Sequence, residues 1–540
     1  MNNEEQSQTL YQDVLRNKGL KHQVALYFRS EKITYPKLLL RIDKMAYFLS
    51  QLGIKKGDVV TLLSPNVPET IVTFYALNKI GATICILHPL LPIAALERSL
   101  KETGSLYFIL LDARLKDYEP LLKDFPSLKT YFISAIPDLN PIEKSVFKKK
   151  TKDILDKILP SQMLDSTRKV SKKLIASVPT NTDYLKPSVY LLSGGTTGRS
   201  KTILLNDKAL RFPGHHAEEI LGKKMDKSLS MIGLLPLFHG FGLAMGIHAP
   251  LMNGASSFLM LKYDGKTIVR GIKKKQISIL ITVPYLAKKL LATKGFKGKK
   301  LQNLYMTFVG ADKPSPSLFK EFDERMEKAG SVNRLYEGYG LTETVTVSFV
   351  NTFTDHKNGT VGRPLSGVSV RIVDPEDYSK ELPTGQDGII LISGTCNCLG
   401  YLNVPPEEQP FYVDRTGKQW IKSGDIGHVD EDGYLVFKNR AKDSFKIAGY
   451  NVFPSDVEAL AEEVEGVNAS AALFIDGPHP YIHLYIESHH AEDYALEETV
   501  RKHLKDNLLP YSMPEKITVL PYFPRTAIGK IDRKTLIHLH

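Results

Sequence analysis

The sequence has little cysteine and no signal-peptide-like start. Its 540 residues include three cysteines, Cys85, Cys396 and Cys398, and the last two form a Cys-x-Cys pair without a nearby histidine or further cysteine. Three cysteines cannot build a disulfide framework, so we expect reduced structural thiols, as in a cytoplasmic protein. The polar, acidic start MNNEEQSQTLYQ has no apolar segment and therefore predicts no signal peptide.

A long hydrophobic run without interruption is also missing. Between Ser228 and Leu261 there is no Asp, Glu, Lys or Arg, but two prolines, an asparagine, two histidines and five glycines break the stretch. A membrane-spanning helix needs about 20 predominantly apolar residues. We therefore expect a buried strand, a loop and a helix here.

Positive charge is in excess, with a net charge of +12 from 71 Lys and Arg against 59 Asp and Glu. Basic residues cluster at 144–173 and 262–300. The first cluster predicts a helix with apolar residues on one face, namely Phe147, Ile154, Leu155 and Ile158. Such a helix suits peripheral contact with an anionic membrane, and the alternative is a solvated surface helix packed on the protein. The basic runs lack interleaved aromatics, which argues against nucleic-acid binding.

The length exceeds what one hydrophobic core can hold, so we expect several domains. Apolar content of 42% and charged content of 24% are typical of globular proteins. Strand-like runs at 58–63, 83–87 and 106–111 alternate with helical patterns, which predicts an α/β fold with parallel sheets. Short strands with many turns at 359–437 predict a β-rich unit, followed after Arg440 by a small α/β piece.

The stretch LLSGGTTGRSK (191–201) follows an apolar run and ends in a lysine. It does not match the common P-loop pattern GxxxxGK[ST] in either register. Its backbone N–H groups, hydroxyls and ammonium could all donate to an anion, through Ser193, Gly194, Gly195, Thr196, Thr197, Gly198 and Lys201. An ordinary turn has the same composition, so this stretch alone does not decide between a phosphate loop and a turn.

Five further motifs follow in order along the chain. They are PLFHGFG (236–242) with His239, YEGYGLTET (336–344), SGD (423–425), NRAKDSFKIAGYNVFPSDVE (439–458) and PRTAIGKIDR (524–533). Each alone has an ordinary explanation, such as a core histidine or a turn-forming aspartate. Together and in this order, they resemble the superfamily of adenylate-forming, AMP-binding enzymes: acyl-CoA synthetases, adenylation domains of peptide synthetases, and luciferases.

The resemblance extends from about residue 20 to the C-terminus. It implies an α/β fold with a large N-terminal domain, 1–439, made of two α/β subdomains and a distorted β-barrel. A hinge at 440–443 would join this domain to a small, mobile α+β domain, 444–540. The implied reaction joins a carboxylate to the α-phosphate of ATP, expels pyrophosphate and then passes the acyl group to CoA.

The resemblance also implies a role for each motif residue. Negative charge builds on the leaving pyrophosphate, which preorganised donors would stabilise. Thr196, Thr197, Gly198 and Lys201 match the loop that holds the β- and γ-phosphates. Glu343 matches the carboxylate that holds Mg²⁺, a metal that takes few protein ligands when phosphates supply the rest. The nucleotide contacts would come from Thr342, Tyr339, Gly340, Gly310 and Ala311, with Asp425 and its basic neighbour Arg440 at the ribose.

Two catalytic positions lie far apart in the sequence, His239 and Lys530. Lys530 matches the lysine that bridges the carboxylate and α-phosphate oxygens during adenylation. Lys442 matches the hinge, and the face around Gly449 would close over the site for the thiol step. One site would then serve two steps through a domain movement.

The acid is expected to be a fatty acid. Amino-acid-activating relatives carry an Asp after the position of His239, and here that position is Gly240, which cannot pair with a buried ammonium. The small, apolar residues 240–246 could admit a hydrocarbon tail, or the glycines could serve only for close packing. The acceptor is CoA or, alternatively, a separate acyl carrier protein, because no carrier-type motif follows Lys530.

Overall fold

The computed structural model describes residues 7–125, 127–193, 201–441, 445–447, 450–452, 454–475, 481–489, 494–508, 512–526 and 529–539. The chain divides into two compact units. Unit 1 comprises 1–281, 340–347 and 394–410, and unit 2 comprises 282–339, 348–393 and 411–540.

Unit 1 contains a seven-stranded sheet in the order β18-β8-β7-β4-β3-β5-β6. Its strands are β3 (Val59–Leu63), β4 (Thr83–Ile86), β5 (Tyr107–Leu111), β6 (Lys129–Ile133), β7 (Pro187–Leu192), β8 (Thr202–Asn206) and β18 (Gly400–Tyr401). The strands from β6 to β7 are parallel, and β8 and β18 are antiparallel additions. The central strands read as continuous apolar runs because both faces of a parallel sheet are covered.

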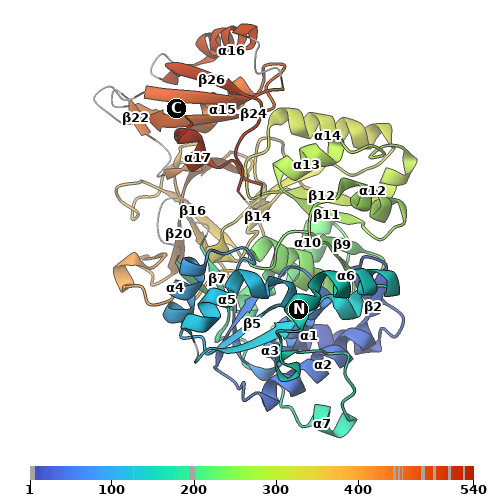
Figure 1. Ribbon diagram of the computed structural model, residues 1–540. Helices are drawn as coiled ribbons and strands as arrows, with labels where there is room; N and C mark the ends of the chain where they lie inside the picture. Colours follow the sequence, from blue (N-terminus) through green and yellow to red (C-terminus); the bar gives the residue numbers. More distant parts are fainter. Residues whose placement is uncertain are drawn as a thin grey trace. The chain divides into compact units, whose positions relative to one another are not determined.

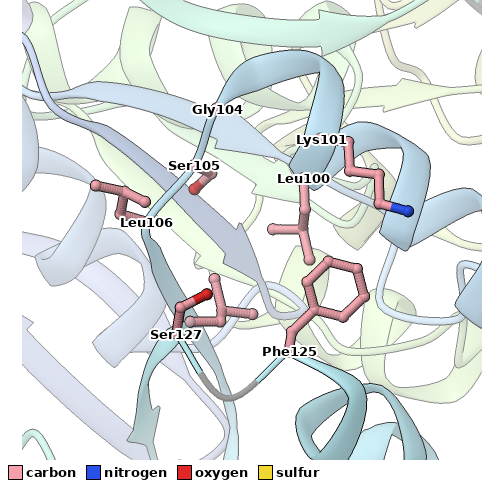
Figure 2. A pocket seen from close by; sticks show the side chains of 8 residues that line it. Leu100, Lys101, Gly104, Ser105, Leu106, Phe125 and Ser127 are labelled. Atoms are coloured by element: carbon pink, nitrogen blue, oxygen red, sulfur yellow. The ribbon is translucent and has the colours of Figure 1, made fainter.

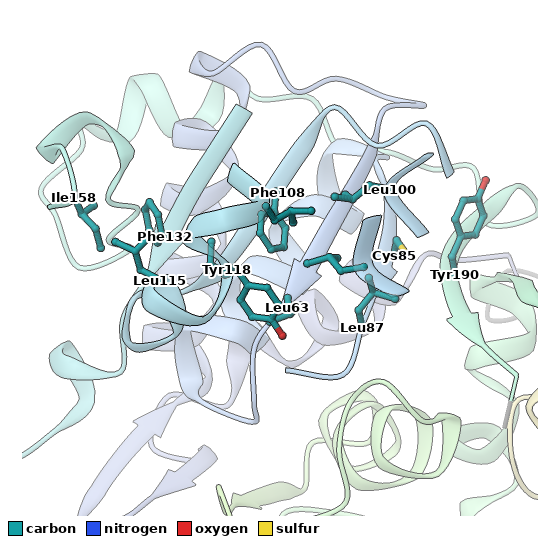
Figure 3. Close-up of a cluster of buried hydrophobic side chains, with 13 residues drawn as sticks. Leu63, Cys85, Leu87, Leu100, Phe108, Leu115, Tyr118, Phe132, Ile158 and Tyr190 are labelled. Carbon is teal, nitrogen blue, oxygen red and sulfur yellow. The ribbon is translucent and has the colours of Figure 1, made fainter. Parts of the chain in front are cut away.

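Helices α2 (Tyr35–Gln51), α3 (Pro68–Ile80), α4 (Ile93–Thr103) and α5 (Leu115–Asp124) alternate with these strands. Figure 3 shows the side chains that fill one core of the unit, among them Phe108 and Tyr118, whose rings meet edge to face at 6.4 Å. The Tyr118 hydroxyl donates to the Leu91 carbonyl at 3.0 Å, so the polar end of this buried ring is satisfied. The alternation of strands and helices predicted from the sequence is confirmed here.

A second sheet of unit 1 has the order β11-β9-β10-β1-β2. Its strands are β1 (Val24–Phe28), β2 (Glu31–Thr34), β9 (Ser230–Gly233), β10 (Ser256–Leu259) and β11 (Ile279–Thr282). The uncharged stretch 228–261 folds into β9, a π-helix at Phe241–His248, α11 (Ala249–Met252) and β10. No helix in the described part of the chain has both the length and the apolarity needed to cross a bilayer.

Several shorter helices complete unit 1. They are α1 (Leu10–Arg16), α7 (Lys172–Ala176), α8 (Asp207–Leu210), α9 (Phe212–His215), α10 (Ala217–Leu221) and α12 (Gly265–Lys273). All three cysteines are buried free thiols. Burial raises the pKa of Cys85 and of Cys398 to about 12, so both thiols stay protonated and unreactive at neutral pH.

The basic cluster forms helix α6 (Pro141–Leu155), which starts with a capping box between Asn140 and Glu143. Ile158 is buried in the core of Figure 3, and Ile154 packs against the same core. The apolar face predicted from the sequence is therefore turned at least partly onto the protein. Membrane contact through this segment stays a prediction.

Unit 2 contains the parallel pair β12 (Met306–Val309) and β13 (Leu335–Tyr339), extended antiparallel by β14 (Phe349–Val350) and β15 (Arg363–Pro364). Helices α13 (Pro284–Leu291) and α14 (Pro316–Lys328) accompany them. The predicted β-rich segment forms a five-stranded antiparallel sheet of β16 (Ser369–Val373), β17 (Gly388–Ser393), β19 (Phe411–Val413), β20 (Gln419–Val429) and β21 (Leu435–Arg440).

The C-terminal part of unit 2 is a small α+β domain. Its sheet has the order β24 (Ala469–Ile475), β25 (Tyr481–Glu487), β26 (Lys516–Leu520), and α15 (Pro454–Ala461) and α16 (Tyr494–Asn507) pack on it (Figure 1). A hairpin of β22 (Phe445–Ile447) and β23 (Tyr450–Val452) precedes the sheet, and α17 (Arg533–Ile537) follows it. The predicted fold class, a large N-terminal α/β part with a smaller C-terminal domain, is confirmed. The domain limits at 439 and 444 stay predictions, and Lys442 lies outside the described residues.

A buried charge network ties α2 to α3 in unit 1. Arg41, 3% exposed, donates to Asp138 Oδ1 at 2.6 Å and to the fully buried carboxylate of Glu69. Glu69 also accepts from the backbone and the hydroxyl of Ser166 at 2.7 Å. In the folded state these groups contact one another instead of water. Removal of Arg41 or of either carboxylate would therefore leave a buried charge without its partner.

We expect Arg41→Met to lower the free energy of unfolding by about 3–5 kcal/mol, because two buried carboxylates lose their cation. Urea unfolding followed by circular dichroism would measure the change. Lys101→Met is the matched control, because Lys101 forms an exposed pair with Glu97 and its loss is expected to cost no more than about 0.5 kcal/mol. A similar, small effect of both variants would contradict the importance of the network.

Candidate active site

The motif YEGYGLTET ends in a strained turn of unit 1. Thr342–Thr344 form a single 3₁₀ turn, and Val345 follows with φ 65° and ψ −59°. The N–H of Thr346 donates to the carbonyl of Thr344 at 2.7 Å, which closes a γ-turn of the rare, positive-φ form. A β-branched residue at this φ is an outlier that costs on the order of 1–3 kcal/mol and persists only when the surroundings enforce it.

Two glycines make room for the turn. A Cβ on Gly240 would lie 1.6 Å from the Val345 carbonyl oxygen, and a Cβ on Gly340 would lie 1.3 Å from that of Thr346. A Cβ on Gly242 would likewise lie 2.2 Å from the Pro236 carbonyl oxygen. The space beside Gly240 and Gly242 is thus filled by the protein's own backbone. These two glycines therefore serve close packing and leave no room for a hydrocarbon tail.

Glu343 projects from this turn toward Tyr401 on β18. The Tyr401 hydroxyl donates to Glu343 Oε1 at 2.8 Å, and the N–H of Cys398 donates to the Glu343 carbonyl at 2.7 Å. The Nζ of Lys201 lies 5.0 Å from the centre of the Tyr401 ring, within cation–π range, and 3.1 Å from Glu408 Oε2. Tyr401 therefore links the predicted metal-binding carboxylate to the predicted phosphate-binding lysine.

The two ends of the predicted phosphate loop are fixed. The N–H of Ser193 donates to the Lys201 carbonyl at 2.8 Å, and the N–H of Lys201 donates to Ser193 Oγ at 2.9 Å. These bonds close the β7–β8 hairpin. The intervening residues, Gly194, Gly195, Thr196, Thr197 and Gly198, lie outside the described residues.

Glu343 has the surroundings of a single metal-binding carboxylate. In the described ranges, no group of three or more His, Cys, Asp or Glu side chains could hold a metal by itself. One carboxylate beside a hydroxyl fits Mg²⁺, which takes its remaining ligands from water and substrate phosphates. It does not fit a metal that needs a full set of protein ligands.

His239 precedes the π-helix Phe241–His248. The N–H of Leu243 donates to its carbonyl at 2.9 Å, and its ring lies 4.7 Å from that of Phe238. π-helical turns are rare and frequently occur at functional sites. Phe238 also lies 4.4 Å from the ring of His88, a neighbour that the sequence did not indicate.

The predicted adenosine-binding residues meet in unit 2. The Tyr339 hydroxyl donates to Asp425 Oδ2 at 2.6 Å, and Arg440 Nε lies 3.2 Å from Asp425 Oδ1. Asp425 and Arg440 are direct partners in the β20–β21 ladder, so the pairing follows from strand register. Burial first, and the Asp425 charge second, raise the pKa of Tyr339, which keeps its hydroxyl a donor. The structure thus brings Tyr339, Asp425 and Arg440 together.

Lys530 interacts electrostatically with Asp425 and Arg440. The N–H of Thr526 donates to the Lys530 carbonyl at 2.8 Å, and Arg525 pairs with Ile531. Burial lowers the pKa of Lys530, and the negative charges of Asp312 and Asp425 oppose this while Arg440 adds to it. Asp312 directly follows the predicted nucleotide-binding residues Gly310 and Ala311.

The other nucleotide-binding candidates of unit 2 follow β12. The N–H of Gly310 donates to the Thr282 carbonyl at 3.3 Å, and Ala311 adopts a positive φ of 69°. Asp312 comes next and is open to solvent. Gly449 lies outside the described residues.

Glu337, two residues before Tyr339, is a further carboxyl that the sequence did not single out. It pairs with Val309 across the β12–β13 ladder and is only partly exposed. Burial raises its pKa to about 8, although Lys313 opposes this. It is therefore a carboxyl that carries a proton at neutral pH.

A small open pocket of unit 1 is separate from these residues. Figure 2 shows its lining: Leu100, Lys101, Gly104, Ser105, Leu106, Phe125, Ser127 and Leu128. The Lys101 ammonium is held by Glu97 at 2.6 Å. No predicted site residue lines this pocket, so we do not assign it to the active site.

Comparison with known proteins gives a family match over most of the chain. A family model described as "AMP-binding enzyme" matches residues 15–402. Curated relatives include a long-chain-fatty-acid–CoA ligase of Bacillus subtilis, 25% identical over 95% of this chain and 91% of the relative. They also include 4-coumarate–CoA ligase 2 of Petroselinum crispum, 26% identical over 94% and 89%.

Solved structures share the fold. ATP-bound MatB from Rhodopseudomonas palustris is 22% identical, with 98% of each chain covered and a TM-score of 0.82. The anthranilate CoA ligase AuaEII in complex with anthranoyl-AMP is 20% identical, with 98% of this chain and 96% of that chain covered and a TM-score of 0.80. At these identities, the likeness extends to the fold alone.

We expect Gly340→Ala to lower the free energy of unfolding by more than about 4 kcal/mol, because its methyl group would overlap the Thr346 carbonyl oxygen. Thermal or urea unfolding would measure the loss. Gly19→Ala is the control, since a Cβ there meets nothing within 4 Å, and we expect a change within about 0.5 kcal/mol. An undisturbed Gly340→Ala protein would show that the turn is not sterically held.

Glu337 predicts a pH dependence of stability. The folded protein holds this proton up to about pH 8, whereas an ordinary glutamate loses it near 4.5. The unfolded chain binds fewer protons in this window, so the free energy of unfolding contributed by Glu337 falls as pH rises from about 4.5 to 8. Glu337→Gln should flatten this fall in melting temperature, and the exposed Glu321→Gln should leave it unchanged. Parallel pH profiles for Glu337→Gln and the parent protein would contradict the assignment.

Proposed function

Because this chain belongs to the AMP-binding enzyme family, we propose that it is an acyl-CoA synthetase that prefers fatty acids. It is an ATP-dependent, AMP-forming ligase. In the first half-reaction, a carboxylate oxygen attacks the α-phosphate of ATP, giving acyl-AMP and pyrophosphate. In the second, the thiol of CoA attacks the acyl carbonyl, giving acyl-CoA and AMP.

One observation carries the proposal for the first half-reaction. In unit 2, Tyr339, Asp425 and Arg440 form a bonded set, and Lys530 is close enough to interact electrostatically with Asp425 and Arg440. A buried carboxylate flanked by a tyrosine and an arginine suits the two hydroxyls of a ribose. An ammonium within electrostatic range of it suits the oxygens that gain negative charge when a carboxylate attacks the α-phosphate.

The residues of unit 1 would hold the triphosphate. Lys201 supplies an ammonium at the end of the glycine-rich loop, and Thr342 a hydroxyl for the α-phosphate. Glu343, oriented by Tyr401, would hold Mg²⁺, which neutralises phosphate charge when it is bound. His239 would lie beside the acyl group. These roles come from the motif resemblance, and the contacts described above are compatible with them.

The preference for a fatty acid rests on charge and on relatives. The stretch 228–261 holds no Asp, Glu, Lys or Arg, and Gly240 leaves no partner for the ammonium of an amino acid. Long-chain-fatty-acid–CoA ligases are among the relatives. Aromatic acids are the second candidate class, because 4-coumarate–CoA ligases match with similar identity.

For the second half-reaction, we propose that the domain after residue 440 turns about Lys442 and brings the surface around Gly449 to the acyl-adenylate. The acceptor would be CoA. The alternative is the phosphopantetheine of a separate carrier protein, which presents the same thiol.

Pyrophosphate release across a panel of acids tests the proposal. The panel contains short, medium and long saturated fatty acids, 4-coumarate, benzoate and several amino acids, each with and without CoA. We expect long or medium fatty acids to give the largest kcat/KM and CoA to be needed for turnover. A preference for an aromatic acid would contradict the fatty-acid assignment. Turnover that occurs only with a carrier protein bearing phosphopantetheine, and not with CoA, would contradict CoA as the acceptor.

Lys530→Ala should lose acyl-adenylate formation by two orders of magnitude or more, since a positioned donor of this kind typically contributes about 3–4 kcal/mol. Thioester formation from supplied acyl-adenylate should persist, because Lys530 acts only in the first step. Single-turnover assays of the two half-reactions separate these effects. Lys534→Ala, an exposed lysine on α17, serves as the control. An equal fall in both half-reactions would exclude this division of labour.

A further inference from the structure

The ammonium of Lys201 already has an anionic partner within the chain. Its Nζ lies 3.1 Å from Glu408 Oε2 and 3.3 Å from the Glu408 carbonyl oxygen, above the ring of Tyr401. No sequence motif connects Lys201 with Glu408, which lies 207 positions further on. Neither residue is buried, since Lys201 is 36% and Glu408 58% exposed, so water and dissolved anions can reach the pair.

The segment that carries Glu408 is tied to Tyr401 of β18, the strand that pairs with β8 next to Lys201. Glu408 ends a 3₁₀ turn, Pro406–Glu408. The side-chain amide of the next residue, Gln409, bonds both backbone groups of Tyr401. The N–H of Tyr401 donates to Gln409 Oε1 at 2.7 Å, and Gln409 Nε2 donates to the Tyr401 carbonyl at 3.0 Å. Tyr401 in turn pairs with Ile203, two residues after Lys201. Strand pairing and the Gln409 amide therefore hold the segments that carry Lys201 and Glu408 near each other.

We propose that Glu408 is an internal anion that occupies Lys201 until the phosphates of a nucleotide or pyrophosphate displace it. The proposal rests on the proposed function, in which Lys201 binds phosphates. One ammonium cannot serve the Glu408 carboxylate and a polyphosphate at full strength together. A polyphosphate carries several negative charges against one on Glu408, so it wins the exchange, but its binding is weakened by the competition.

The competition has a consequence for turnover. Pyrophosphate leaves after adenylation, and a lysine that can return to Glu408 releases it more readily than a lysine without a partner. Glu408 thus sets the affinity for polyphosphate without touching the reacting atoms. Exposed ion pairs correspond to about a 1.5- to 5-fold change in an equilibrium constant, so this is the size of effect expected.

The test compares Glu408→Gln with the parent enzyme. Binding of inorganic pyrophosphate, with Mg²⁺ present, is measured by isothermal titration calorimetry at low and high salt, and pyrophosphate inhibition of turnover is measured in parallel. We expect Glu408→Gln to bind pyrophosphate about 2- to 5-fold more tightly at low salt, with a smaller difference at high salt. Glu407→Gln, the exposed neighbour in the same turn, is the matched control and should bind as the parent does.

A second substitution isolates the pair. In a Lys201→Met background, Glu408→Gln should no longer tighten pyrophosphate binding, because the competition needs the ammonium. Unchanged or weaker binding by Glu408→Gln, with normal loss of affinity in Lys201→Met, would overturn the role of Glu408 and leave the proposed function intact. Unchanged binding by Lys201→Met would instead remove Lys201 from phosphate binding, and the role of Glu408 with it. Absence of acid-dependent pyrophosphate release in the parent enzyme is the separate outcome that defeats the proposed function.

Discussion

The unit 1 site depends on close packing at two glycines. Gly240 lies against the carbonyl oxygen of Val345, and Gly340 lies against that of Thr346. The γ-turn at 344–346 brings the carbonyl oxygens of Val345 and Thr346 against Gly240 and Gly340, where only a residue without a Cβ fits. Val345 pays in backbone strain for this geometry, yet its side chain is 1% exposed, so burial offsets part of that cost. Because the turn follows Thr342 and Glu343 directly, a relaxed turn would point both side chains elsewhere.

In unit 2, the corresponding constraint is electrostatic. Asp425 is 1% exposed, and Arg440 and the Tyr339 hydroxyl compensate the cost of burying its carboxylate. The strand register places Arg440 opposite Asp425, and the raised pKa of Tyr339 keeps its proton available. These contacts orient the Asp425 carboxylate, so in the proposed function a ribose would meet acceptors that are already oriented.

The sequence predicted what depends on local pattern and motif order. The alternation of strands and helices, the folding of the uncharged stretch 228–261 and the small C-terminal α+β domain could all be recognised, because periodicity reports burial. Tyr401, Glu408 and Glu337 could not be found in this way. Each acquires its importance through a partner distant in sequence or through burial, as when Tyr401 meets Glu343 and Lys201. For Gly240, the sequence showed the lack of a side chain. It did not show that the Val345 carbonyl fills the space beside it.

The charges around Lys530 connect its position to the proposed two-step reaction. Burial disfavours its ammonium more than Asp312 and Asp425 favour it, and Arg440 adds repulsion, so its pKa is lowered. The positive charge is therefore incompletely compensated by the protein. An acid carboxylate and the α-phosphate would complete the compensation during adenylation, when negative charge moves onto the oxygens between them. After pyrophosphate has left, less negative charge remains to hold the lysine. In the proposed function, departure of its domain would then cost less than before the reaction, so the thiol step would follow adenylation.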